Sequence, residues 1–483
     1  MNYDVIIVGC GIAGLAAACS AAEEGVKVGL VERATKEESG GNTRYTQAFL
    51  RIKSNGEVRD DFEDQLAGAS NPTIDPALLQ HSMKPYEEWP PLLKAYAFTD
   101  SMLIKAFADG VPESIAWLCK QGITLTPSWP WLGEPQRMAP SGGGLAIIEI
   151  LTQRAEELGV HFHYETVARS LVQNQKGDVR GLRAWCKYNG VEELGSKAVV
   201  LACGGFEGNL EMSTKYLGLN AHFLRPVCRG GMYNKGEGIE MALKIGAAPA
   251  GQYDNFLGEP IDPRSGKAEA SVMYYIFGIL VNKLGKRFMD EGSEMLEWTL
   301  GDIPRAIINQ PGGIAYIIYD LKKVENVPLW EKLGNSDKQP IRAGSIGELA
   351  SKIEVNPAEL ERTIKSFNSS VQDGKFEPLK LDGKCTKGIE PPKSNWALLI
   401  DENDLYCYPI VASNVFTFGG LKVTSNSEVV NLDGSPIPGL YAAGETVGMF
   451  YEKYIGSISV LRGLVFGRMA GKHSATQIAS GRL

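Results

Sequence analysis

Apolar residues in this chain occur in short, unbroken runs that end in glycine-rich turns. Residues 4–8 form the first run, rich in β-branched side chains, and a Gly-x-Gly-x-x-Gly turn follows at 9–14. An alanine-rich stretch and a second apolar run at 27–31 come next. Because a strand buried on both faces has a continuous apolar run, the pattern predicts a strand, a turn, a helix and a second strand of a parallel α/β sheet.

Each glycine of this turn has a distinct place in a dinucleotide-binding fold. Gly9 would make the tight turn, Gly11 would let the backbone approach a pyrophosphate, and Gly14 would let the helix pack closely on the strand. The free N–H groups at the helix N-terminus would face the phosphates. Glu32 ends the second run, where a carboxylate can accept hydrogen bonds from an adenosine ribose. The stretch therefore predicts dinucleotide binding.

The continuation of the chain favours FAD over NAD. After Glu32 the alternation of strands and helices stops, and a glycine-rich turn at 39–43 follows that could lie against a flavin. Two later runs, at 198–206 and 439–448, are again predicted as buried strands that lead into glycines.

A change of composition marks a second domain. From about residue 251 to about residue 413 the chain has mixed strand and helix patterns with proline-rich joints. The sequence therefore predicts an α/β fold, with a Rossmann-like FAD-binding domain of residues 1–250 and 414–483 and an inserted α+β cap (substrate) domain of residues 251–413. Residues 60–122 are predicted to be mostly helical, with a break at Pro112.

Charge and hydropathy exclude several kinds of partner. The 483 residues include 57 acidic and 49 basic ones, a net charge of −8 without a basic block, so nucleic acid is not expected as a partner. No apolar run approaches the roughly 20 residues that cross a bilayer, so no integral membrane span is expected.

The cysteines and histidines predict neither disulfides nor a metal site. The eight cysteines form no CxxC pair, which favours buried thiols in a reducing compartment and a cytoplasmic location. His161 and His163 alternate on one predicted strand without a cysteine or acid cluster nearby, so no metal ligand set is expected. Since no run is typical of an iron–sulfur or haem site, the electron acceptor would be a separate quinone, dye or redox protein.

Taken together, the turn at 9–14, the turn at 39–43, the run at 198–206 and the stretch at 439–448 resemble the flavoprotein family of fumarate reductases, tricarballylate dehydrogenases and 3-ketosteroid dehydrogenases. The resemblance covers essentially the whole chain. With the motifs above, it implies bound FAD and the following cofactor contacts: Gly9, Gly11, Ile12, Ala13, Gly14, Glu32, Arg33, Gly40, Gly41, Asn42, Thr43, Val167, Ala202, Cys203, Gly204, Gly419, Gly444, Glu445, Ser457, Ser459 and Val460.

Several functional positions of that family differ here. Covalent members carry a histidine where this chain has Asn42, so the FAD is expected to be non-covalent. The arginine general acid of fumarate reductases corresponds to Met295, and their histidine before the Thr-x-Gly-Gly turn corresponds to Val415 or Phe416. Their second substrate arginine corresponds to Tyr454. We therefore do not expect this chain to reduce fumarate by that mechanism.

The replacements are similar to those of two other branches. A tyrosine before a glycine-containing turn resembles the 3-ketosteroid dehydrogenases, and residues 229–238 and 416–422 resemble the tricarballylate dehydrogenases more closely. A tricarboxylate needs several cations. The candidates are Arg44, Arg229, Lys453 and Arg462. An apolar pocket that accepts a ring is also predicted, from Trp129, Trp131, Tyr274, Tyr275, Phe416, Phe418, Phe450, Tyr451 and Tyr454.

These resemblances imply a desaturase that forms a C=C bond next to a carbonyl, on a cyclic ketone, a keto acid or a tricarballylate-like acid. Tyr454, with the N–H groups of the following helix, would hold the carbonyl. Tyr274 or Tyr275 would take the α-proton as the base, Arg44 or Arg229 would stabilise the anion of that tyrosine, and the β-hydride would pass to flavin N5. Two alternatives stay open: an ene reductase, and a flavoprotein subunit of a larger redox complex.

Overall fold

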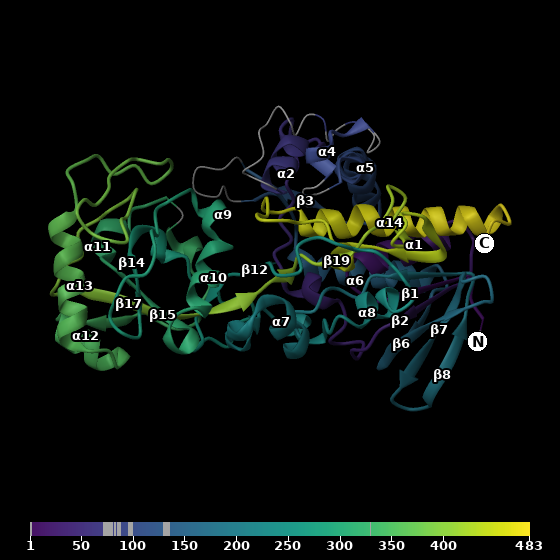
Figure 1. Cartoon of the computed structure of the whole chain (residues 1–483), viewed down its shortest axis with the longest axis horizontal. Coiled ribbons are helices and arrows are strands. Elements are labelled where there is room, and N and C mark those ends of the chain that lie inside the picture. The colour runs from purple at the N-terminus through teal and green to yellow at the C-terminus, as the bar shows by residue number, and fades with distance from the viewer. Residues whose placement is uncertain are drawn as a thin grey trace.

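The computed structural model describes residues 2–70, 81, 84, 88–94, 100–128, 136–328 and 330–483. The molecule is elongated, with a large domain that carries both termini and a smaller cap at the opposite end (Figure 1). The chain returns from the cap through the long strand β17, Leu405–Asn414. No helix in the described ranges is long and apolar enough to cross a bilayer.

The large domain is built on a six-stranded sheet that is parallel except for the edge strand β20. Its spatial order is β20 (Glu428–Val430), β21 (Pro436–Ala442), β9 (Ala198–Leu201), β1 (Val5–Val8), β2 (Val28–Val31) and β5 (His161–His163). All residues of β1, β2 and β9 are buried, which agrees with their continuous apolar runs. Val5 lies opposite both Val28 and Ala198, so the carboxyl ends of these three strands meet at one edge of the sheet.

Helices cover one face of this sheet, and a smaller sheet covers the other (Figure 1). On the first face, α1 (Ile12–Glu23) packs between α6 (Gly143–Glu157) and the C-terminal helix α14 (Ser459–Ala479). On the second lie α8 (Glu237–Leu243) and the sheet of β6 (Thr166–Gln173), β7 (Val179–Cys186) and β8 (Gly190–Gly195).

Glycines allow α14 to lie directly on α1. Gly463, Gly467 and Gly471 are four residues apart and therefore share one face of α14. A Cβ atom at Gly467 would stand 2.3 Å from the carbonyl oxygen of Ala13, and one at Gly471 would stand 2.3 Å from that of Ala17. Larger side chains would separate the helices, so this contact fixes where α14 begins relative to the turn at 9–14.

The predicted helix break at Pro112 is wrong. Helix α5 runs through it, from Ser101 to Lys120. The apolar face of α5 is buried along this length, and the Phe107 ring lies 5.2 Å from that of Phe62 and 5.7 Å from that of Phe466, measured between centroids. Burial of this face offsets the hydrogen bond that a proline removes from a helix.

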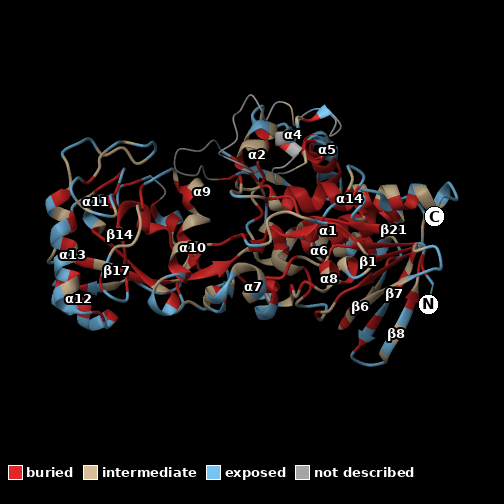
Figure 2. Cartoon of the chain, viewed as in Figure 1, coloured by how far each residue is buried: buried red, intermediate tan, exposed pale blue. Residues whose placement is uncertain are grey.

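The cap is an α+β unit around a second sheet. Its strands β10 (Arg225–Pro226), β17, β15 (Ile314–Tyr319) and β14 (Ile279–Asn282) lie in that order, with β13 (Pro260–Ile261) and β16 (Ile341–Ala343) also paired to β17. Alternate residues of β15 enter two apolar cores: Ile317 and Tyr319 one, Tyr316 and Ile318 the other. Helices α12 (Ile346–Ile353) and α13 (Pro357–Ser370) cover the second core and expose their outer faces (Figure 2).

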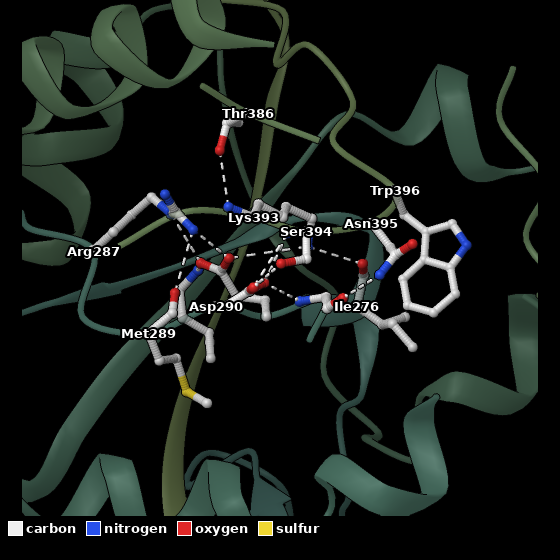
Figure 3. A network of polar contacts seen from close by, with 12 residues as sticks. Ile276, Arg287, Met289, Asp290, Thr386, Lys393, Ser394, Asn395 and Trp396 are labelled. Carbon is white, nitrogen blue, oxygen red and sulfur yellow. Dashed lines mark hydrogen bonds and ion pairs between the residues drawn. The ribbon is translucent and has the colours of Figure 1, made fainter. Parts of the chain in front are cut away.

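A buried polar network lies within the cap (Figure 3). The guanidinium of Arg287 binds the carboxylate of Glu291 with two N–O distances of 2.6 and 3.1 Å. Lys393 donates to the carbonyl oxygen of Ile276 at 3.0 Å, and burial lowers its pKa to about 8. The network ties β14 to the loop around residue 393 and is a structural feature of the cap.

Replacing Gly467 with alanine should lower the free energy of unfolding by about 1 to 3 kcal/mol, because the new methyl group overlaps the backbone of α1. Chemical unfolding of the purified protein measures this. The matched control is Gly347→Ala in α12, where a Cβ atom meets nothing within 4 Å and stability should stay the same or rise by up to about 1 kcal/mol. Equal effects of the two substitutions would contradict the packing account.

Candidate active site

A long cavity lies at the carboxyl ends of β1, β2 and β9. It encloses about 1270 Å³ of empty space, open solvent included, and it extends from the end of β2 to the N-terminus of α14. All predicted cofactor contacts line it except Gly14, Gly40, Gly419 and Ser457. Gly14 instead packs the helix on the turn, because a Cβ atom there would stand 1.9 Å from the carbonyl oxygen of Gly9. The structure thus brings together residues as far apart in the chain as Gly9 and Val460.

The turn at 9–14 has the geometry of a phosphate site. Gly9 has φ +105°, and a Cβ atom there would stand 2.4 Å from the carbonyl oxygen of Ala202. Gly11, the N-cap of α1, lines the cavity together with Ile12 and Ala13, so the N-terminus of the helix borders the cavity. Ile12 N–H donates to Thr43 Oγ1 at 3.3 Å, which joins the turn to the segment at 39–43. A dinucleotide pyrophosphate fits this arrangement.

Glu32 organises the β2 end of the cavity. Its carboxylate accepts hydrogen bonds from Cys10 N–H at 2.8 Å and from Ala34 N–H at 2.7 Å. Burial raises the pKa of this carboxyl group, and the two N–H donors oppose that rise. Each oxygen keeps a second lone pair, so the group can still accept a ribose hydroxyl. Arg33 is held beside it by Tyr233 and Glu237, at 2.8 and 2.6 Å.

Three polar residues surround the α14 end of the cavity. Asn42 donates to Glu207 Oε1 at 2.8 Å and to the carbonyl oxygen of Val415 at 2.9 Å. Glu445 accepts from Thr417 N–H at 2.9 Å. Burial and the neighbouring Glu445 raise the pKa of Glu207 well above its usual range, and burial also raises that of Glu445. Glu207 was not predicted from the sequence. The only signal for it was its place directly after the 198–206 strand and glycines.

Tyr454 lies at the N-terminus of α14. Its Oη atom accepts hydrogen bonds from the backbone N–H groups of Ile458 and Ser459, both at 2.9 Å. These N–H groups were expected to hold a substrate carbonyl together with Tyr454. They donate instead to the tyrosine oxygen itself. The hydroxyl proton can still be donated, because a phenol both accepts and donates. Ser459 lines the cavity and Tyr454 does not, so the hydroxyl of Tyr454 is joined to the cavity wall through the N–H group of Ser459.

An aromatic wall surrounds Tyr454. Its ring meets those of Phe416 and Phe450 edge-on, with centroids 4.9 and 5.2 Å away, and Phe418 lies behind them. The Arg462 guanidinium stacks 4.5 Å from the Phe450 centroid and is 1 % exposed. Burial lowers the pKa of Arg462 to about 10. Of these rings only that of Phe416 lines the cavity, so the apolar pocket that accepts a ring stays a prediction. Trp129 and Trp131 lie outside the described residues.

The two cap tyrosines predicted as proton acceptors do not reach the cavity. Tyr275 is fully buried in the cap core, with its hydroxyl 3.4 Å from Thr299 Oγ1. The Tyr274 ring stacks on Trp330 at 4.2 Å, also within the cap core. Burial raises the pKa of both phenols, which disfavours their anions as bases. We therefore do not retain either tyrosine as the base.

The two arginines predicted to stabilise that base also lie outside the cavity wall. Arg44 donates to the carbonyl oxygen of Ser39 at 3.4 Å. Arg229 pairs with Glu38 at 2.5 Å, and its side chain is 66 % exposed. Their positions support neither the anion-stabilising role nor a tricarboxylate site.

A buried ionic cluster next to Tyr454 was not predicted. Glu297, in the cap helix α9 (Leu296–Thr299), pairs with Arg51 at 3.0 Å and with Arg137 at 2.6 Å. All three side chains are at most 4 % exposed. Arg51 and Arg137 come from distant segments without a recognisable motif, so no sequence signal joins them.

Among the residues that the structure describes, no group of three or more His, Cys, Asp or Glu could hold a metal ion. His161 Nδ1 and His163 Nε2 both contact the hydroxyl of Tyr3, at 2.9 and 2.7 Å.

Three curated relatives span nearly the whole chain. Urocanate reductase of Eggerthella lenta is 29 % identical, over 98 % of this chain and 75 % of its own length. A cytochrome-type fumarate reductase of Shewanella frigidimarina is 26 % identical, over 98 % of this chain and 77 % of its own length. Vinyl phenol reductase of Lactiplantibacillus plantarum is 26 % identical, over 98 % of this chain and 96 % of its own length.

Solved structures show the same fold. The open conformation of a flavocytochrome c3 fumarate reductase superposes with a TM-score of 0.72 at 25 % identity, over 98 % of this chain and 78 % of that one. The 3-ketosteroid Δ1-dehydrogenase of Sterolibacterium denitrificans superposes with a TM-score of 0.74 at 20 % identity, over 99 % of this chain and 100 % of that one. At this identity the likeness shows the fold alone. The FAD binding domain family matches residues 4–456. The chain therefore belongs to the FAD binding domain family and is an FAD-dependent oxidoreductase that acts on CH–CH groups.

Proposed function

We propose that this protein is an ene reductase, which adds two electrons and two protons across a C=C bond that is conjugated to an aryl or carbonyl group. The observation that carries the proposal is the Tyr454 hydroxyl, held by two N–H groups at the start of α14 beside the cavity. The three relatives described above are reductases, which supports this direction over the desaturase reading.

Bound FAD would supply or accept the hydride at the reacting carbon. The second hydrogen must then come from a proton donor of the chain. Tyr454 suits this role because the N–H groups of Ile458 and Ser459 already point at its oxygen and would stabilise the negative charge left after proton donation. The positive end of the α14 dipole would also stabilise this negative charge.

The surrounding side chains indicate the shape of the substrate. Phe416 and Phe450 flank Tyr454, and Phe416 also lines the cavity. Such a wall would accept a flat, apolar ring attached to the alkene. The same tyrosine could take a proton in the reverse reaction, so a desaturase that forms the conjugated alkene is the second candidate.

The structure also supports non-covalent FAD. Asn42 occupies the position that a histidine takes in covalent members, and no histidine is among the described residues of the cavity wall. The thiols of Cys10 and Cys203 line the cavity, but burial raises the pKa of both, which disfavours the nucleophilic thiolates.

Acid precipitation of the purified yellow protein should therefore release all of its flavin into the supernatant. The absorbance of the supernatant and the mass of the pelleted protein measure this. A protein mass increased by that of the flavin would overturn the non-covalent assignment.

Anaerobic reoxidation tests the direction of the reaction. We expect dithionite-reduced enzyme to recover its visible flavin absorbance within seconds of adding a conjugated enone or a vinyl arene, with stoichiometric formation of the saturated product. A saturated ketone should bleach oxidised enzyme at least tenfold more slowly. Faster bleaching by the ketone than reoxidation by the enone would reverse the assignment in favour of a desaturase.

Replacing Tyr454 with phenylalanine should lower kcat by about 10²- to 10⁴-fold, since a general acid contributes that much. The flavin should stay bound, as its absorbance spectrum will report. The matched control is Tyr253→Phe, which removes a hydroxyl that donates to the carbonyl oxygen of Gly420 at 2.7 Å outside the cavity wall. Turnover of Tyr454→Phe within threefold of the control would exclude Tyr454 as the proton donor.

A further inference from the structure

Two arginines stand opposite one another beside the loop that carries Tyr454. Leu50 and Met138 form an antiparallel bridge, with backbone N–O distances of 2.8 and 3.2 Å in the two directions. Arg51 and Arg137 are the next residues along the two segments, so their side chains start from facing positions. Like charges at facing positions repel one another, and burial strengthens that repulsion.

The carboxylate of Glu297 lies between these two guanidinium groups. Its Oε1 atom accepts from Arg51 Nη1 at 3.0 Å and from Gly456 N–H at 2.6 Å, and its Oε2 atom accepts from Arg137 Nη2 at 2.6 Å. Two guanidinium groups and one backbone N–H therefore converge on one carboxylate. This donor set is the kind that recognises carboxylates generally.

The cluster is coupled to the loop that leads into α14. Arg137 Nη1 donates to Ser457 Oγ at 2.8 Å, and Arg51 N–H donates to the carbonyl oxygen of Ser457 at 3.0 Å. Ser457 has φ +66°, an unfavourable value for a residue with a side chain, so these bonds hold a strained position. Ser459 follows two residues later and lines the cavity, so this short loop connects the buried cluster to the cavity wall.

Arg51 and Arg137 lie behind the cavity wall, and the cations of the wall itself are not available to a substrate carboxylate. Among the described residues of the wall these are Arg33 and Arg462. Arg33 is paired with Glu237 at the β2 end, and Arg462 is stacked on Phe450. The pair held by Glu297 is thus the place where the substrate end of the site could bind an anion, and a carboxylate of the chain itself already occupies it.

We propose that Glu297 determines which substrate charge the site accepts. Its carboxylate fills the anion position between Arg51 and Arg137, so that the site selects an uncharged conjugated alkene over the corresponding carboxylate. The proposal rests on the proposed ene reductase function. It goes further by naming the substrate class and the residue that sets it.

Glu297→Gln tests the proposal, because glutamine keeps the size of the side chain and removes the negative charge. The first measurement is benzoate binding to the oxidised holoenzyme, followed by the perturbation of the flavin spectrum, with benzamide as the uncharged probe. We expect benzoate to bind Glu297→Gln at least tenfold more tightly than wild type, and benzamide to bind both within threefold. The double variant Arg51→Gln/Glu297→Gln should lose most of the gain.

Glu291→Gln is the matched control. Glu291 is also a buried carboxylate with a bidentate arginine partner, but it belongs to the cap network of Figure 3. Its substitution should lower stability and leave benzoate binding within threefold of wild type. A similar gain for both variants would attribute the effect to a loosened cap and overturn the proposal, as would benzoate affinities of Glu297→Gln and wild type within threefold.

The second measurement is the ratio of kcat/KM for methyl cinnamate to that for cinnamate, which differ in charge at one end of the same alkene. We expect this ratio to fall at least tenfold in Glu297→Gln, mainly through a lower KM for cinnamate. If wild type reduces no alkene, the ene reductase assignment fails while the benzoate titration still decides the role of Glu297.

If Glu297→Gln does not retain FAD, Glu297→Ala with added formate replaces it. Recovery of folded holoenzyme by formate supports the anion position, and no recovery contradicts it.

Discussion

The contact between α1 and α14 is the constraint on which the site depends. Gly463, Gly467 and Gly471 let the last helix of the chain lie against the backbone of the first helix. This contact places the N-terminus of α14 beside the turn at 9–14, so that two helix N-termini face one cavity. The Tyr454 loop, the aromatic wall and the ionic cluster with Glu297 all take their positions from the start of α14.

The cap contributes to this site through few groups. Its tyrosines 274 and 275 belong to the apolar core that gives the cap its own stability, and Glu297 is the ionised cap residue that reaches the Tyr454 loop in the described contacts. A buried carboxylate shared by two arginines is costly to separate from them. The cap position and the geometry of the proton donor are therefore coupled through this side chain.

Much of the large domain could be predicted because its signals are local. The runs at 4–8 and 27–31 and the glycines between them specify strand, turn and helix by their own conformational preferences, and 17 of the 21 predicted cofactor contacts line the cavity. Pro112 shows the limit of such signals, since burial of the face around Phe107 outweighed a helix-breaking residue. Tyr274 and Tyr275 show another limit. An apolar, aromatic stretch of sequence is equally compatible with a buried core and with the wall of a pocket.

The sequence by itself determined the dinucleotide turn, the buried parallel strands and the aromatic composition near Tyr454. Only the tertiary structure decided that the Tyr454 oxygen binds the α14 N–H groups, that Glu207 adjoins Glu445, and that Arg51, Arg137 and Glu297 meet. The reason is physical. Backbone preferences act over a few residues, whereas Glu207 and Glu445, like Arg51, Arg137 and Glu297, come from segments that are distant in the chain and meet only in the folded protein. Tyr454 lies only four and five residues before Ile458 and Ser459, but that spacing does not specify that its hydroxyl turns back onto their N–H groups.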